Sequence, residues 1–243
     1  MRRVTAASRQ ATSFAQSVWE WAKSIGFAFF LFLVIRTFLI QAFKIPTGSM
    51  EDTLLIGDFL LVNKAVYGAQ IPGTHYRLPA FEAVGRQDVI VFEYPDPNDE
   101  YSTKPDYVKR VVGLPGDTVQ MVEKRVYVNG RSLNEPYAHY LPIDPDDHYE
   151  PQFEWQRRYL APGYDPVAYR PTKDNWGPLV VPPGKYMVLG DNRDNSADSR
   201  YWGFVDTGLI KGKPLIVYFS KKSDELIPEF HDIRYQRIGN VIK

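Results

Sequence analysis

The sequence predicts a mainly β, sheet-rich domain with an inserted loop-rich second lobe, tethered by one N-terminal transmembrane helix. An apolar segment near the N-terminus is long enough to cross a bilayer. After it come short apolar runs bounded by turn residues, without a long amphipathic helical period. Residues 131–184 are rich in Pro, Asp, Tyr and Trp and have little periodicity, which predicts the inserted lobe.

The predicted membrane segment covers residues 25–43. Its apolar run continues through Arg36, which costs about 2.5–3.5 kcal/mol in hydrocarbon, and less when the long side chain reaches the outer headgroups. Basic residues precede the run, so the positive-inside rule places residues 1–24 in the cytoplasm and residues 44–243 outside. Hydropathy alone leaves a removable signal peptide open as the alternative.

The extracytoplasmic part is expected to consist of short strands. Asn129-Gly130 predicts a tight hairpin turn. Trp155 and Trp176 give the inserted lobe apolar area to bury, so a folded unit is expected there and not an acidic linker. The predicted strands are Phe59–Asn63, Asp88–Phe92, Tyr107–Val112, Thr118–Val122, Arg125–Val128, Tyr186–Leu189 and Leu215–Phe219.

Composition argues against several classes of function. The 29 Lys and Arg residues balance 29 Asp and Glu residues, and this lack of a basic excess argues against nucleic acid as the main partner. The absence of cysteine excludes disulfides, cysteine nucleophiles and thiolate metal sites. The four histidines are isolated and fit no metal-ligand spacing, so no metal site is expected. The G-x-S-x-G and S-x-x-K signatures are absent as well.

The first segment with candidate chemistry is Ile45–Asp58, directly after the membrane segment. Pro46 fixes its own φ, Gly48 lets the backbone approach another group closely, and Ser49 lies between apolar neighbours. A shallow apolar pocket around the Ser49 hydroxyl is one interpretation. A turn or helix N-cap built from Thr47 and Ser49 is the alternative.

The second segment is Tyr107–Asp117, a predicted strand that ends in a Pro-Gly turn. Side chains alternate along a strand, so one of the adjacent cations Lys109 and Arg110 points toward the core. Burial lowers the pKa of a lysine from about 10.4 by as much as 3–5 units, and the neutral amine can act as a base. A lysine that extends to solvent from an edge strand is the alternative.

The third segment is Gly190–Gly203, which is rich in Asp, Asn, Ser and Arg. Its charged side chains can form an ion-pair network that fixes a tight loop, with Ser196 as a small hydroxyl inside it. No frame of the segment satisfies the spacing of a calcium-binding EF-hand loop. A solvated turn is the alternative interpretation.

Together, the three segments resemble the bacterial type I signal peptidases, or leader peptidases, which are Ser-Lys dyad serine endopeptidases. The resemblance covers the anchor and the stretches IPTGSMEDTLLIGDFLLVNK, YVKRVVGLPGD and GDNRDNSADSRYWGFV in the family's order, while residues 131–184 show no match. It implies that the anchor is retained and that the mainly β domain is catalytic.

The resemblance also assigns roles to residues. It implies that Ser49 is the nucleophile, that Lys109 is the general base, and that no histidine is needed. The implied oxyanion hole consists of the Ser49 backbone N–H and the Thr47 hydroxyl. Ser196 is implied to hydrogen-bond the Lys109 amine and orient it. Three further side chains are implied to brace the loop: Asp198, Arg200 and Arg110.

The implied reaction is the removal of N-terminal signal peptides from exported preproteins, with no cofactor and no metal. Shallow apolar pockets would accept small residues at the first and third positions before the cut, an Ala-x-Ala pattern. The chain would span the cytoplasmic (inner) membrane once, with its catalytic domain on the periplasmic face, in contact with membrane lipid and near the export translocon. The implied pocket residues are Ile45, Met50, Leu54 and Val108.

One departure and two alternatives remain. Many relatives have Pro where this chain has Asp52, which leaves the local backbone stiffness open. A dedicated pilin or conjugation maturation peptidase on the same scaffold would cut one substrate where a signal peptidase cuts many. A non-catalytic, membrane-anchored periplasmic binding module would use the three segments as structural turns only.

Overall fold

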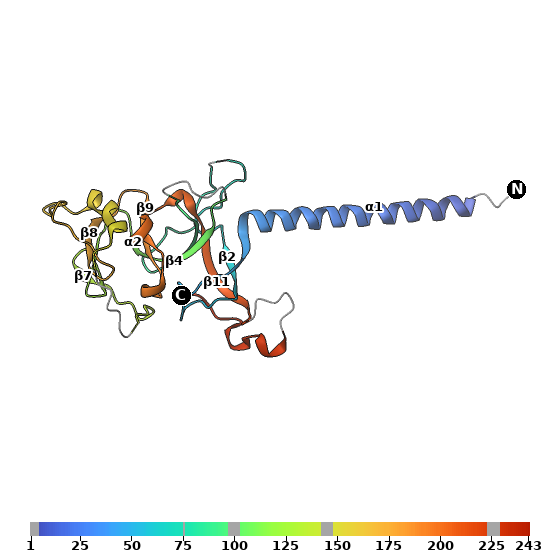
Figure 1. Ribbon diagram of the computed structural model, residues 1–243. Helices are drawn as coiled ribbons and strands as arrows, with labels where there is room; N and C mark the ends of the chain where they lie inside the picture. The colour runs from blue at the N-terminus through green and yellow to red at the C-terminus, as the bar shows by residue number, and fades with distance from the viewer. Residues whose placement is uncertain (1–4, 75, 97–102, 142–147, 223–228) are drawn as a thin grey trace.

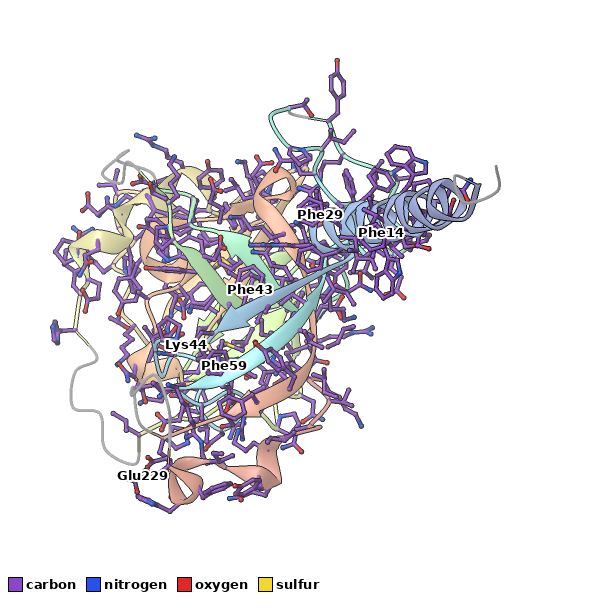
Figure 2. The ribbon with its side chains drawn as sticks, turned by 90° about the vertical axis from the view of Figure 1, so that its right-hand side faces the viewer. Phe14, Phe29, Phe43, Lys44, Phe59 and Glu229 are labelled. Atoms are coloured by element: carbon purple, nitrogen blue, oxygen red, sulfur yellow. The ribbon has the colours of Figure 1, made fainter. Side chains whose placement is uncertain are left out.

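A long helix projects from a β-rich body in the computed structural model, which describes residues 5–74, 76–96, 103–141, 148–222 and 229–243 (Figure 1). Helix α1 (Thr5–Val34) continues as a short π-helix, η1 (Ile35–Leu39). Within it, the stretch Gln16–Leu39 is long and apolar enough to cross a membrane, and none of it is buried against the body. Figure 2 shows Phe14 and Phe29 standing out from α1, clear of the sheet.

The end of the apolar segment differs from the prediction. Residues 40–43 were assigned to the membrane helix, but they lie in strand β1 (Ile40–Lys44), which pairs antiparallel with β2 from Ile40 opposite Asn63 to Lys44 opposite Phe59. Hydropathy cannot separate the two structures, because apolar residues suit both a membrane helix and a half-buried strand. The helix therefore ends at Leu39, and the chain enters the sheet without a linker.

A seven-stranded antiparallel sheet forms the larger part of the body, in the order β1-β2-β11-β3-β4-β9-β10. The long strand β11 (Ile210–Ser220) is bulged and pairs with both β2 and β3. This strand joins the N-terminal strands to those that carry the second and third candidate segments. The other strands are β2 (Asp58–Asn63), β3 (Val89–Glu93), β4 (Asp106–Gly113), β9 (Lys185–Leu189) and β10 (Val205–Asp206).

A second sheet of four strands has the order β7-β6-β5-β8. Its strands are β5 (Thr118–Val122), β6 (Arg125–Val128), β7 (Arg131–Ser132) and β8 (Trp176–Val180). Asn129 and Gly130 both have positive φ, 53° and 76°, between β6 and β7, as the predicted hairpin turn requires. Strands β7 and β8 lie near the two ends of residues 131–184 and pair with β6 and β5. Both ends of the predicted inserted lobe therefore belong to this second sheet.

The mainly β prediction is confirmed, and all seven predicted strands are present. Four strands were not predicted: β1, β7, β8 and β10. Two of them, β7 and β10, have only two residues each, and β8 contains Gly177 and Pro178, which are unfavourable in strands. The short helical turns are η2 (Pro151–Tyr159), η3 (Arg193–Asn195), α2 (Ser199–Trp202), η4 (Thr207–Leu209), η5 (Phe230–Asp232) and η6 (Tyr235–Arg237).

Three buried apolar clusters hold the body together, and one of them supports the candidate site. This cluster packs Met50 and Leu54 against Leu60, Val89 and Val217 of the larger sheet. Side chains that are almost fully buried therefore hold the Ser49 segment against the larger sheet. The second cluster lies around Phe92 and Val188, and the third fills the four-stranded sheet.

Candidate active site

Ser49 lies on a tight turn between β1 and β2. The turn is closed by backbone hydrogen bonds from Glu51 to Gly48 and from Leu54 to Met50, of 3.0 and 2.7 Å. The Ser49 carbonyl accepts a hydrogen bond of 3.1 Å from the N–H of Asn192, which belongs to the third candidate segment. These contacts fix the backbone of Ser49 and leave its side chain half-buried.

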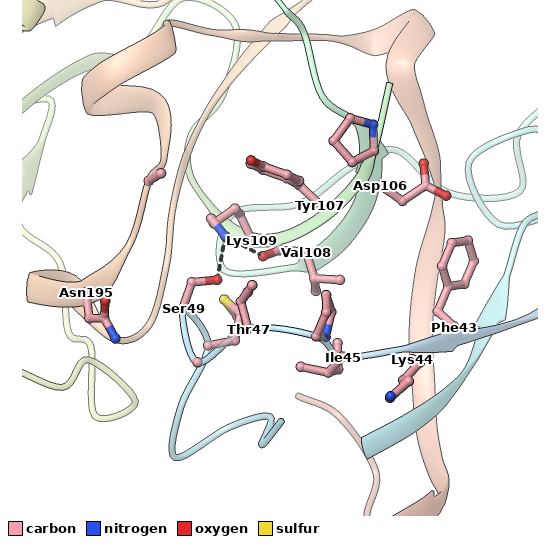
Figure 3. Close-up of a pocket in the computed structure, with 15 residues that line it drawn as sticks. Phe43, Lys44, Ile45, Thr47, Ser49, Asp106, Tyr107, Val108, Lys109 and Asn195 are labelled. Atoms are coloured by element: carbon pink, nitrogen blue, oxygen red, sulfur yellow. Dashed lines mark hydrogen bonds between the residues drawn. The ribbon is translucent and has the colours of Figure 1, made fainter. Parts of the chain in front are cut away.

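Lys109 projects from β4 to the same place. Its Nζ lies 2.6 Å from Ser49 Oγ and 3.1 Å from the Val108 carbonyl oxygen, as the dashed lines in Figure 3 show. Lys109 is buried, at 3% exposure, in agreement with the prediction that one cation of this pair points toward the core, and Arg110 is buried as well, at 2%. Both faces of β4 are covered here, and Arg110 ends on Asp191 on the other face.

The buried position changes the acid–base chemistry of Lys109. Burial lowers the pKa of its ammonium group from 10.5 to about 8, against the opposing effects of the Asp198 and Asp191 carboxylates. A measurable fraction of this side chain is therefore the neutral amine near neutral pH. A neutral amine within hydrogen-bond distance of a hydroxyl can accept its proton.

A cavity of about 400 Å³ opens beside the pair (Figure 3). Ile45, Met50 and Val108 line it as expected, but Leu54 does not, because it is fully buried in the core beneath the turn. Thr47 also lines the cavity and is exposed. Seven lining residues were not candidates in the sequence analysis: Phe43, Lys44, Pro105, Asp106, Tyr107, Asn195 and Ala197.

The third candidate segment is held by buried ion pairs, and Asp198, Arg200 and Arg110 all take part in them. Arg200 donates to both oxygens of Asp198 at 2.8 and 2.9 Å, and Asp198 also accepts from the Gly190 N–H at 3.1 Å. Arg110 pairs with Asp191 of the same segment, at 2.9 and 2.7 Å. Together with the pair of Arg193 and Glu135, three carboxylate–guanidinium pairs brace the loop.

Ser196 is buried beside the pair but does not make the expected contact. Within the described part of the chain its Oγ has no hydrogen-bond partner, so the implied bond to Lys109 is not present. A Cβ built on Gly190 would lie 2.2 Å from Ser196 Oγ and 2.5 Å from the Ser49 carbonyl oxygen, so all three groups crowd one spot. Glycine is required at position 190 to let these segments meet.

Several polar residues near the site were not found from the sequence. Thr53 donates to Asp191 at 2.6 Å, and Arg237 reaches both the Thr53 carbonyl oxygen and Asp58. Glu135, which pairs with the buried Arg193 of the third segment, was not found either. Their partners are distant in sequence, so no local pattern signals them. Among the described residues, no group of three His, Cys, Asp or Glu side chains could hold a metal ion.

The arrangement is suited to acyl transfer. It combines a hydroxyl, an amine that can be neutral, and an apolar cavity open to a chain segment. A hydroxyl with a base at 2.6 Å meets the geometric requirement for an activated nucleophile.

Comparison with known proteins gives a consistent result. Residues 18–219 match the family model described as signal peptidase, peptidase S26. A signal peptidase I of Pseudomonas fluorescens is 38% identical over 236 residues, covering 90% of this chain and 78% of the relative. A signal peptidase I of Aquifex aeolicus is 35% identical over 232 residues, covering 81% and 82%.

Among solved structures, the crystal structure of a signal peptidase I from Enterococcus faecalis covers 55% of this chain and 98% of its own, with 31% identity and a TM-score of 0.36. The match to the family model extends over most of the chain and includes the turn, the strand and the loop that form the site. The chain therefore belongs to the signal peptidase family, peptidase S26.

Proposed function

We propose that this protein removes N-terminal signal peptides from exported preproteins, with Ser49 as nucleophile and Lys109 as general base. The observation that carries the proposal is the 2.6 Å contact between Lys109 Nζ and Ser49 Oγ at the edge of an apolar cavity. The relatives named signal peptidase I support the substrate class.

In the acylation step, neutral Lys109 takes the proton from Ser49 Oγ as the oxygen attacks the scissile carbonyl carbon. The resulting ammonium then gives its proton to the nitrogen of the departing mature protein when the C–N bond breaks. The signal peptide remains as an ester on Ser49. Lys109, neutral again, takes a proton from a water molecule that attacks the ester, and the proton returns to Ser49 Oγ.

The oxyanion of the tetrahedral intermediate is proposed to bind the Ser49 backbone N–H and the Thr47 hydroxyl. Two observations support this assignment. Within the described residues the Ser49 N–H donates to no acceptor, so it is available to a substrate oxygen. Thr47 is exposed at the wall of the same cavity. Loss of one such donor typically lowers the rate about 10²–10³-fold.

Specificity for small residues before the cut is proposed to come from the cavity walls. Ile45 and Met50 are buried side chains packed into the core, so they cannot move aside to admit a large residue. Val108 narrows the cavity from β4. An alanine fits such a site, and a large or charged side chain would have to displace core residues.

The remaining part of the proposal concerns the membrane. Helix α1 is proposed to anchor the chain in the cytoplasmic membrane, with its N-terminus inside, the sheets on the outer face, and the site near the translocon from which preproteins emerge. The apolar stretch Gln16–Leu39 supports the anchor, and the excess of basic residues before it supports the orientation.

Cleavage in detergent of a preprotein with an Ala-x-Ala site tests the proposal. Mass spectrometry then identifies both product ends. We expect one cut after the second alanine by the wild type and by the control Ser132→Ala, a serine of the second sheet. Ser49→Ala should give no product. A panel of preproteins completes the test, because a dedicated maturation peptidase would cut only one of them. If none of the preproteins is cut, the protein is a non-catalytic binding module.

A further inference from the structure

A second cavity lies where the membrane helix meets the sheet. It has a volume of about 880 Å³ and is formed by the last turns of α1, by η1, and by β1 and β2. Its walls are largely apolar and include Phe32, Ile35, Ile40 and Leu61. None of its lining residues lines the active-site cavity, so the two are separate. The mechanism proposed above makes no use of it.

Two cations, Arg36 and Lys64, line this apolar cavity. Neither has an acidic partner among the residues that the structure describes. Neighbouring lysines are paired: Lys211 lies 2.6 Å from Asp106, and Lys213 lies 2.6 Å from Asp88. The cavity therefore concentrates positive charge that the protein itself does not neutralise.

The electrostatic environment of Lys64 is unfavourable to its own charge. Burial lowers the pKa of Lys64, and the charge of Lys211 lowers it further. A negative group bound next to Lys64 would offset both effects. The cavity thus favours an anionic ligand at its polar end and apolar groups along its walls.

The position of the cavity defines the source of such a ligand. About 20 helical residues cross the hydrocarbon core, so a span that begins at Gln16 ends close to Arg36. Figure 1 shows α1 leaving the body beside β2, and residues of both elements or of the segments next to them line the cavity. Arg36 and Lys64 then lie at the level of the lipid headgroups, and the apolar walls face the acyl chains.

We propose that this cavity binds one anionic membrane phospholipid, with its phosphodiester between Arg36 and Lys64 and its acyl chains against the apolar walls. The inference rests on the membrane anchoring that is part of the proposed function. Such a lipid would fix the base of the helix against β1, the strand that leads directly into Phe43 and Ile45 of the active-site cavity.

Lipid retention by the full-length chain tests this. The protein is reconstituted into vesicles of equal amounts of phosphatidylglycerol and phosphatidylcholine with the same acyl chains, then extracted in detergent, and the bound lipids are counted by mass spectrometry. We expect about a 10- to 30-fold enrichment of phosphatidylglycerol, since each basic residue near the membrane surface contributes roughly a fivefold effect. In Arg36→Gln/Lys64→Gln the enrichment should fall to near one.

The control variant is Arg125→Gln/Arg131→Gln, which removes the same charge from exposed positions of the second sheet and should keep the enrichment. Equal retention of both lipids by the wild type would overturn the inference, as would unchanged enrichment in Arg36→Gln/Lys64→Gln. Displacement of the lipid by inorganic phosphate would assign the site to a soluble anion instead.

Preprotein cleavage by the same samples separates this inference from the proposed function. Cleavage without phosphatidylglycerol enrichment would overturn only the lipid site. Enrichment without cleavage would leave the lipid site in place and overturn the proposed enzymatic reaction.

Discussion

Thr53 Oγ1 donates a hydrogen bond of 2.6 Å to Asp191 Oδ2, which joins the Ser49 turn to the loop that follows β9. The same carboxylate accepts hydrogen bonds of 2.9 and 2.7 Å from Arg110. Arg110 follows Lys109 directly in β4. A single carboxylate therefore connects the segment of the proposed nucleophile with the strand of the proposed base.

Thr53→Val tests whether this connection positions the pair. Valine keeps the volume but removes the hydroxyl, so the hydrogen bond from residue 53 to Asp191 is lost while Asp191 keeps Arg110. We expect kcat for preprotein cleavage to fall about 10- to 100-fold with KM nearly unchanged, since small displacements of reacting groups have effects of this size. Thr53→Ser retains the hydroxyl and should restore most of kcat. Wild-type kcat in Thr53→Val would show that the hydrogen bond has no positioning role.

Burial of Lys109 should be visible in the pH dependence of stability. The pKa of Lys109 is about 8 in the folded protein and 10.5 in the unfolded chain, where the side chain is not buried. Between these pH values the unfolded chain therefore binds more protons than the folded protein. The free energy of unfolding therefore rises with pH between pH 8 and 10.5. Below pH 8, burial of the charged ammonium group lowers it by the full amount of about 3 kcal/mol.

Lys109→Met removes this cost. The variant should be more stable than the wild type at pH 7, and the difference should shrink toward pH 10.5, as measured by denaturant unfolding in detergent at both pH values. Lys213→Met is the control, because its ammonium pairs with Asp88 and its loss should bring no gain at pH 7. Equal stability of wild type and Lys109→Met at pH 7 would contradict the buried charge.

Gly190→Ala should abolish cleavage. An added Cβ would lie 2.2 Å from Ser196 Oγ and 2.5 Å from the Ser49 carbonyl oxygen, so the loop and the Ser49 turn must separate. We expect a loss of at least about 100-fold in kcat/KM. Gly208→Ala is the matched control, since its Cβ meets nothing closer than an Asp206 oxygen at 3.7 Å. Near-normal cleavage by Gly190→Ala would mean that the close approach is not needed.

The backbone at Asp52 is unsuited to the Pro that the family resemblance would place at this position. Its φ is +73°, in the left-handed region, whereas proline is fixed near −65°. Its carboxylate also lies 3.0 Å from His139 Nδ1. The backbone of this turn is therefore adapted to a residue other than proline.

Asp52→Pro should accordingly distort the turn next to Met50 and lower preprotein cleavage roughly tenfold or more. Asp52→Gly adopts positive φ without strain and should stay within about threefold of the wild type. Kinetics of both variants under one set of conditions distinguish backbone conformation from the contact with His139. A strong loss in Asp52→Gly together with a mild one in Asp52→Pro would assign the role to the side chain.

Local sequence patterns were sufficient for much of the fold. Strands β5 and β6 have the predicted boundaries, because alternating apolar residues and flanking turn residues define them. Strand β1 was missed, since its apolar residues continue those of the helix without a break. Hydropathy measures apolar content, and only the pairing with β2 decides that these residues form a strand.

For the site, the resemblance to the signal peptidases implied that Ser49 and Lys109 come together, and their side chains lie 2.6 Å apart. The supporting contacts were not predictable in the same way. Arg110 and Asp191 are 81 residues apart, and Arg237 and Asp58 are 179 residues apart. The resemblance implied that Leu54 lines the pocket, but the turn closed by the hydrogen bond from Leu54 to Met50 directs it into the core.

The most direct test of the central claim is the pH dependence of kcat/KM for preprotein cleavage by the wild type and by Lys109→Arg. Arginine keeps a cation but cannot become a neutral base near neutral pH. The account predicts that wild-type kcat/KM rises about tenfold per pH unit and levels near pH 8, the pKa of Lys109, while Lys109→Arg shows no cleavage at any pH. A Lys109→Arg enzyme with the wild-type profile would contradict the Ser49–Lys109 dyad.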